Sequence, residues 1–84
     1  MTSAFVQIHL FAAARAAVGA ATVEAAPGSL GDLLTGLEAR YPSFVAVRPR
    51  CSFLVDGLAV HGDPSEVLVG AGSTVDVLPP FAGG

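Results

Sequence analysis

The sequence contains one helical stripe of apolar residues between segments that alternate like strands, and this pattern limits the possible folds more than any other. The stripe follows the spacing of a single helix face and consists of Leu30, Leu33, Leu34, Leu37 and Tyr41. Ser29 stands at the N-cap position with Asp32 three residues later, in the manner of a capping box, and Pro42 ends the helix. Because an apolar stripe must be covered, we expect this helix to pack against a sheet as core.

The segment before this helix predicts two strands joined by a short helix. Residues 5–11 alternate, with every second side chain apolar, as in a half-buried strand. Residues 12–18 are strong helix formers, and Gly19 stops them. Residues 21–26 predict a second strand, which can pair antiparallel with the first.

The segment after the main helix predicts three more strands. Asp56-Gly57 fits the type I′ turn of a hairpin between residues 52–55 and 58–60. Residues 74–78 alternate again and predict the last strand. The connections give weaker signals: residues 44–47 are ambiguous, 48–50 predict a loop and 65–69 predict a short helical turn.

Composition and charge argue against several classes of function. The chain has 84 residues, of which 52% are hydrophobic, and this suits one small domain that needs neither metal nor disulfide. Its net charge is −3 and arginines are its only fixed cations, so we expect no nucleic-acid binding. The first apolar run is short and includes Gln7 and His9, which predicts neither a signal peptide nor a membrane span. We therefore expect a cytoplasmic protein that does not bind membranes.

No group of residues predicts a catalytic or metal site within the domain. His9 and His61 lack further ligands at metal-binding spacing. Cys51 adjoins Arg50, but a small buried residue at a strand entrance is the preferred interpretation over a nucleophile. Residues 70–73 lack the lysine of a phosphate-binding loop and are interpreted as a turn. We expect no cofactor bound by the chain itself, and chemistry that is carried out on its C-terminal end.

The last six residues, Pro79-Pro80-Phe81-Ala82-Gly83-Gly84, point most directly to function. The prolines lack N–H donors and force the chain out of a strand ladder. The glycines have no Cβ, so they can enter a slot that is too narrow for other residues and leave only backbone and carboxylate to act. The sequence thus predicts a domain over residues 1–78 and a flexible tail over 79–84 that presents a carboxylate to another protein's active site.

Several motifs carry a family resemblance: Leu10–Arg15 followed by Val18-Gly19, Leu30–Leu34, Val55–Gly57, and the ending Val75–Gly84. With them, the sequence resembles the MoaD family, the small sulfur-carrying subunit of molybdopterin synthase, within the MoaD/ThiS ubiquitin-like proteins. The resemblance implies an α+β, ubiquitin-like β-grasp fold, with a mixed sheet packed on one main helix and a protruding Gly-Gly tail. One departure is the stretch at 70–73, where such carriers often have an acidic turn, and it leaves the strand pairing there open.

The resemblance also implies a chemistry for the tail. An E1-like adenylating enzyme (MoeB-like) uses ATP to activate Gly84, and a persulfide from a sulfur donor enzyme then leaves a C-terminal thiocarboxylate. The chain is not catalytic alone; its thiocarboxylate reaches into a molybdopterin synthase large subunit (MoaE-like) and gives sulfur to a pterin precursor. Gly83 and Ala82 are expected at the tail entry. The expected partner interface consists of Phe11, Ala59, Leu78, Pro80 and Phe81, with core packing an equal alternative for Phe11 and Leu78.

Three other functions fit the same residues. Related carriers deliver sulfur to thiamine thiazole, cysteine or thiolated natural products, although thiazole carriers typically lack a segment resembling Phe11–Arg15. A ubiquitin-like protein modifier would be joined to other proteins through an isopeptide bond. It could not form chains through lysine, because the sequence has none. An inert interaction domain would not need its tail at all.

Overall fold

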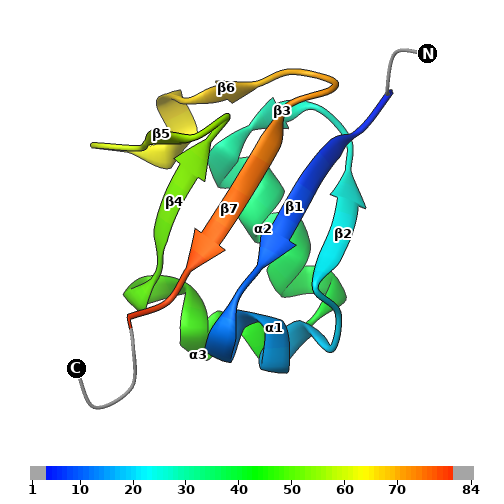
Figure 1. The fold of residues 1–84 in the computed structure, drawn as a ribbon, viewed down its shortest axis with the longest axis vertical. Coiled ribbons are helices and arrows are strands. Elements are labelled where there is room, and N and C mark those ends of the chain that lie inside the picture. The colour runs from blue at the N-terminus through cyan, green and yellow to red at the C-terminus, as the bar shows by residue number, and fades with distance from the viewer. Residues whose placement is uncertain (1–3, 81–84) are drawn as a thin grey trace.

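The computed structural model describes residues 4–80 and arranges them as a mixed sheet with its main helix packed across one face (Figure 1). In chain order the elements are β1 (Val6–Leu10), α1 (Ala12–Val18), β2 (Thr22–Ala25), β3 (Gly28–Ser29), α2 (Leu30–Arg40), α3 (Phe44–Val47), the 3-10 helix η1 (Arg48–Arg50), β4 (Ser52–Val55), β5 (Leu58–Ala59), the 3-10 helix η2 (Pro64–Glu66), β6 (Leu68–Val69) and β7 (Thr74–Leu78).

Within residues 4–80, the main sheet has five strands in the order β2-β1-β7-β4-β5. Its central pair, β1 and β7, is parallel, and every other neighbouring pair is antiparallel. The predicted antiparallel pairing of the first two strands is confirmed. Because β1 and β7 run side by side in the same direction, the last strand ends in the middle of the sheet, next to the end of β1 (Figure 1).

The core lies between the sheet and α2. Along β1 and β7 every second residue is buried, and these residues meet the buried leucines of α2. Phe44 of α3, which has 0% exposure, is the largest fully buried side chain. The predicted helical stripe is therefore core at its four leucines, whereas Tyr41 is only partly buried.

Both ends of α2 follow from local chemistry. The N–H of Asp32 donates to the Ser29 hydroxyl at 3.0 Å, which satisfies a backbone donor that has no partner within the helix. At the other end, Tyr41 leaves the helical conformation with φ −134° and ψ 84°. The residue before a proline avoids the helical region, so Pro42 accounts for this ending.

The connections differ from the sequence prediction in two places. Residues 48–50, predicted as a loop, form η1 because Pro49 sits in its first turn, where the missing N–H costs nothing. The helical turn predicted over 65–69 is limited to η2, which starts one residue earlier and ends at Glu66. Asp63 caps η2, and its carboxylate accepts the Ser65 N–H at 2.9 Å. The residues after it instead form β6, which pairs with β3 in a small second sheet.

Replacing Gly36 by alanine is expected to stabilise the protein. Gly36 lies in the interior of α2, and an added Cβ would meet no atom within 4 Å. Glycine costs about 1 kcal/mol relative to alanine in a helix interior, so urea denaturation should show a gain of up to about 1 kcal/mol in unfolding free energy. Gly31 is the matched control, because a Cβ there would lie 3.2 Å from the backbone of Ser65. An equal gain from both substitutions would contradict this view of the packing.

Candidate functional site

The candidate site begins where β7 leaves the sheet. Leu78, the last residue of β7, is paired with Ser52 of β4. Pro79 and Pro80 follow outside any strand, as their missing N–H groups predict. The predicted reacting and entry residues, with one predicted interface residue, lie outside the described part of the chain: Phe81, Ala82, Gly83 and Gly84.

Leu78 lies on the outer face of the sheet, opposite the core. Val75 and Val77 have 0% exposure, whereas Asp76 and Leu78 are only partly buried. Side chains along a strand alternate between its two faces, which places Leu78 on the outer face. Of the two roles left open for Leu78 by the sequence, packing against α2 does not fit this position.

Phe11 lies beside Leu78 at the end of the parallel pair. Leu10 is opposite Val77, and the Phe11 N–H donates to the Val77 carbonyl at 3.3 Å. The Phe11 backbone is still extended, so its side chain continues the alternation of β1 onto the outer face. Phe11 is 44% exposed, and core packing does not describe it either.

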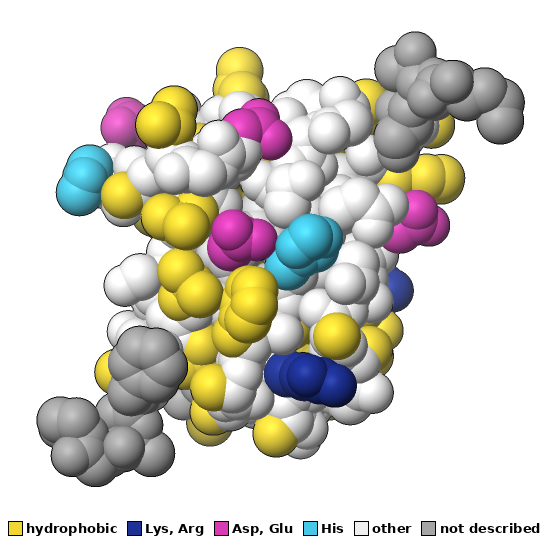
Figure 2. Space-filling view, viewed as in Figure 1, with side chains coloured by type: hydrophobic (Ala, Val, Ile, Leu, Met, Phe, Trp, Pro, Cys, Tyr) yellow, Lys and Arg dark blue, Asp and Glu magenta, His cyan; other side chains and the backbone are white. Residues whose placement is uncertain are grey.

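An outer apolar patch therefore forms next to the end of β7; it consists of Phe11, Leu54, Ala59 and Leu78. Leu54 joins it because it pairs with Ala59 on one side and with Asp76 on the other. Figure 2 shows hydrophobic side chains gathered on this face of the sheet. Leu54 was not among the predicted interface residues. The sequence feature that could have indicated it is the run Phe53-Leu54-Val55, which places apolar residues on both faces of one strand.

Polar pairs border the patch on the same face. His9 Nδ1 lies 3.5 Å from Asp76 Oδ1, and the Gln7 amide donates to the Glu24 carboxylate at 2.8 Å. An apolar centre with a polar border is typical of protein interfaces. The geometry thus suits docking of a partner beside the end of β7.

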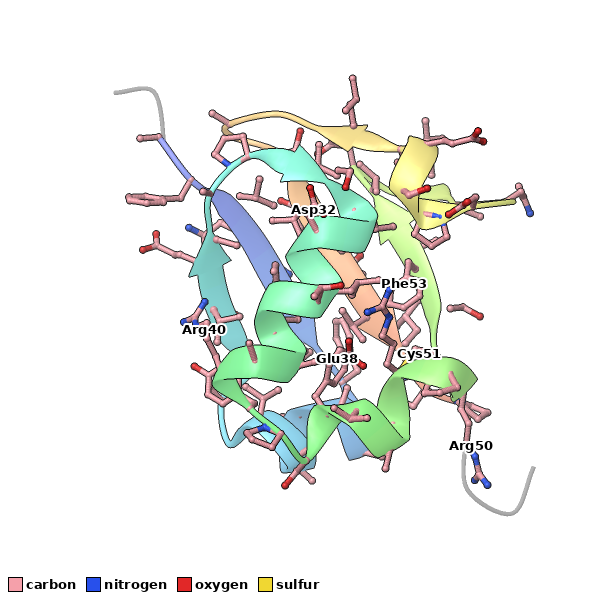
Figure 3. All side chains as sticks on the ribbon, turned by 180° about the vertical axis from the view of Figure 1, so that it is seen from behind. Asp32, Glu38, Arg40, Arg50, Cys51 and Phe53 are labelled. Carbon is pink, nitrogen blue, oxygen red and sulfur yellow. The ribbon has the colours of Figure 1, made fainter. Side chains whose placement is uncertain are left out.

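Cys51 lies close to this site but has the character of a packed residue. It immediately precedes Ser52, which pairs with Leu78. Its thiol donates to the Val47 carbonyl at 3.4 Å, and Figure 3 shows it beside η1, with Arg50 projecting from the same segment. Burial raises the pKa of the Cys51 thiol, which disfavours the thiolate. The structure therefore agrees with the packing interpretation.

Within residues 4–80, no group of three or more His, Cys, Asp or Glu side chains could hold a metal ion. None of the helices in this part of the chain is long and apolar enough to cross a membrane.

Asp56 fixes the start of β7. It occupies the hairpin turn with φ 49°, followed by Gly57 with φ 82°, as the predicted type I′ turn requires. Its carboxylate accepts the Thr74 N–H and the Ser73 hydroxyl, both at 2.9 Å. In the turn at residues 70–73, which contains no acidic residue, the Ser73 N–H donates to the Gly70 carbonyl at 3.1 Å. This turn and the Asp56 carboxylate together set where β7 begins.

We expect Asp56→Asn to weaken the acid sensitivity of the fold. The hydrogen bonds from Thr74 and Ser73 lower the pKa of Asp56 below its usual value, so its carboxylate stabilises the fold above that usual value, near pH 4. This stabilisation is lost as the pH falls through the lowered pKa. Urea denaturation from pH 7 to 2 should therefore show a larger loss of stability in the wild type than in Asp56→Asn. Asparagine tolerates the positive φ, so the turn itself is kept. Parallel losses in both proteins would contradict the assignment.

Comparison with known proteins places the chain in a family. The ThiS family matches residues 8–84. The chain belongs to the ThiS family. No curated protein matches it.

Solved structures similar to this ThiS-family protein share its fold across nearly the whole chain. Small archaeal modifier protein 1 from Methanosarcina acetivorans gives a TM-score of 0.82 at 23% identity, covering 100% of this chain and 99% of that one. A putative molybdopterin converting factor subunit 1 from Pyrococcus furiosus gives 0.79 at 21% identity, covering 94% and 100%. A complex of subunits 1 and 2 of molybdopterin-converting factor from Helicobacter pylori gives 0.70 at 14% identity, covering 95% and 99%. The predicted membership of the MoaD/ThiS ubiquitin-like proteins and the predicted β-grasp fold are thus confirmed.

Proposed function

We propose that this protein is a sulfur carrier in molybdopterin biosynthesis, with the carboxylate of Gly84 as the sulfur-bearing group. The observation that supports this most is the course of β7. A central strand with a neighbour on each side ends at Leu78 in the outer apolar patch, and the sequence continues through Pro79-Pro80 to Gly83-Gly84. A partner that docks on the patch would receive the following residues at a fixed point.

The proposed chemistry overcomes the poor reactivity of a carboxylate. An E1-like enzyme joins the Gly84 carboxylate to AMP and releases pyrophosphate from ATP, which creates a good leaving group. The terminal sulfur of a persulfide, supplied by a sulfur donor enzyme, displaces AMP. A thiol then cleaves the sulfur–sulfur bond and is itself oxidised to a disulfide, which leaves the thiocarboxylate. The product is a nucleophilic sulfur that stays attached to a protein, as suits a reducing cytoplasm.

The acceptor step requires a second protein. We propose that a large subunit docks on the outer apolar patch and takes the thiocarboxylate into its own pocket, where sulfur passes to a pterin precursor. The similarity to a chain of the Helicobacter pylori complex of subunits 1 and 2 supports a partner of this kind. In this proposal the large subunit supplies the catalytic groups, and the small protein supplies the sulfur and the docking surface.

Protein modification is the second candidate function. It is favoured by the structural similarity to small archaeal modifier protein 1. Because the sequence has no lysine, such a modifier could not extend itself through lysine side chains. Immunoblots for adducts that depend on Gly84 would detect this function in cells.

The acceptor can be tested directly. Thiocarboxylated protein, mixed with a molybdopterin synthase large subunit from the same cell and the pterin precursor, should yield molybdopterin, and its own mass should return to that of the carboxylate. If sulfur stays on the carrier while the complex forms, the carrier serves another pathway.

A change of Gly83 to valine is expected to block activation without affecting the fold. A β-branched side chain should not enter a slot that fits only glycine, so intact mass should reveal no added sulfur. The unfolding free energy should change by less than about 0.5 kcal/mol, as for a surface substitution. Thiolation at the normal rate would contradict the narrow entry.

A further inference from the structure

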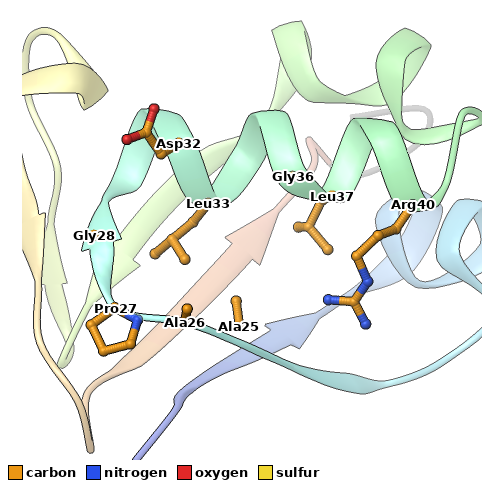
Figure 4. A pocket seen from close by; sticks show the side chains of 9 residues that line it. All are labelled: Ala25, Ala26, Pro27, Gly28, Asp32, Leu33, Gly36, Leu37 and Arg40. Atoms are coloured by element: carbon orange, nitrogen blue, oxygen red, sulfur yellow. The ribbon is translucent and has the colours of Figure 1, made fainter.

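A separate groove lies between β2 and α2, at the opposite edge of the sheet from β5 (Figure 4). Its volume is about 330 Å³, and its middle is lined mainly by small and apolar residues: Ala25, Ala26, Pro27, Leu33, Gly36 and Leu37. Among the described residues that line it, the charged ones are Asp32 at one end and Arg40 at the other (Figure 4). The groove is therefore apolar in the middle and of opposite charge at its two ends.

The strand beside this groove has a free edge in the described sheet, where β2 pairs only with β1. The Leu10 N–H donates to the Ala21 carbonyl at 2.8 Å, which sets the register of the antiparallel ladder. In such a ladder, alternate residues direct their backbone groups away from the neighbouring strand. Thr22 and Glu24 are those residues here, so their N–H groups face outward, where a further strand could pair.

Arg40 already lies at this edge. Its Nη1 donates to the Glu24 carbonyl at 2.9 Å, and its guanidinium is 5.3 Å from the centre of the Tyr41 ring. A guanidinium has five N–H donors, so it can also bind a carboxylate. A hydrogen bond to a carboxylate is charge-assisted and therefore stronger than the bond to the neutral Glu24 carbonyl.

The distance between the charged ends defines the length of a ligand. Asp32 and Arg40 are eight residues apart on α2, which at 1.5 Å per residue is about 12 Å. An extended peptide covers about 13 Å in four residues, and its alternate side chains share a face. A basic residue, an apolar residue and an acidic residue at every second position would therefore meet Asp32, the apolar middle and Arg40 together.

We propose that the β2–α2 groove binds an extended segment of a partner protein, with the pattern basic-x-apolar-x-acidic, as an added antiparallel strand. Antiparallel pairing is the more stable kind, and β2 runs from the Arg40 end of the groove toward the Asp32 end, so the basic residue comes first. The groove is separated from the end of β7 by β1, so binding there leaves the outer apolar patch open. This surface would recruit a partner while the sulfur-carrier site stays accessible.

The probe is a capped pentapeptide, Lys-Thr-Val-Thr-Asp, titrated into nitrogen-15-labelled full-length protein and followed by NMR. We expect chemical-shift changes at the groove, with new protection from hydrogen exchange at the Thr22 and Glu24 amides. The proposal would be overturned by chemical-shift changes confined to the outer apolar patch. It would also be overturned if no shifts changed at the highest peptide concentration. Shifts that depend on protein concentration without peptide would assign the edge to a second copy of the chain and would overturn it as well.

Variants separate groove binding from effects on the fold. Gly36→Leu fills the groove from a position with no atom within 4 Å of an added Cβ, and it should weaken peptide binding about tenfold or more. Ala39→Leu, exposed on the same helix but outside the groove lining, should leave binding within about twofold. Equal affinities for the two variants would overturn the assignment.

A charge exchange provides a test that does not depend on Gly36. Arg40→Glu should lower the affinity for the peptide that ends in aspartate about tenfold. It should raise the affinity for a peptide that ends in lysine instead. If Arg40→Glu bound neither peptide, Arg40 would only shape the edge of β2, and the proposed charge recognition would be wrong.

Discussion

Deletion of Gly84 is expected to abolish sulfur loading completely while the domain stays folded. The deleted chain would end at Gly83, so its carboxylate would stop one residue short, about 3.5 Å, of the place where an adenylating enzyme holds the reacting group. Catalysis depends on positions held within about 1 Å, so a displacement of this size should remove the reaction rather than slow it. Incubation with the adenylating enzyme, ATP and a persulfide donor, followed by intact mass, should show one oxygen exchanged for sulfur only in the full chain.

The control for this experiment is the stability and docking of the shortened chain. The core of the described domain ends at Val77, so the thermal midpoint of the deleted chain should match that of the full one. Its docking on the large subunit should also persist, because the outer apolar patch is unchanged. Sulfur loading of the shortened chain at the normal rate would remove Gly84 from the mechanism and, with it, the proposed function.

Much of the fold could be predicted because its strongest signals are local. The leucine stripe of α2, the Asp56-Gly57 turn and the alternation in β1 and β7 each act within a few residues, and each has its predicted place in the structure. The short strands β3 and β6 were missed because two residues cannot show a period. Their pairing depends on η2 packing against α2, where the backbone of Ser65 lies 3.2 Å from the Cβ position of Gly31.

The site was predicted only where its residues also had a local signal. Phe11 and Leu78 could be named, but their common face depends on the register between β1 and β7, which brings together residues far apart in the sequence. Leu54 was missed because three successive apolar residues, Phe53-Leu54-Val55, do not reveal which side chain faces outward. The groove beside β2 could not be predicted either, because it exists only once Arg40 and the strand edge have been brought together.

Leu78→Glu is expected to disrupt the complex with the large subunit while leaving the free protein folded. Leu78 is on the outer face and only partly buried, so a carboxylate there remains in contact with water and the unfolding free energy should fall by no more than about 1 kcal/mol. In the complex the same carboxylate would be buried without a partner, which costs several kcal/mol.

The dissociation constant should therefore rise about a hundredfold or more, as measured by calorimetry with the large subunit. Thr22→Glu is the matched control, because it adds the same charge to an exposed site on the outer face of β2, two strands away from β7. It should change the dissociation constant by no more than about threefold. If Leu78→Glu and Thr22→Glu bind equally well, the partner docks elsewhere. The outer apolar patch would then have no part in presenting the C-terminal glycines.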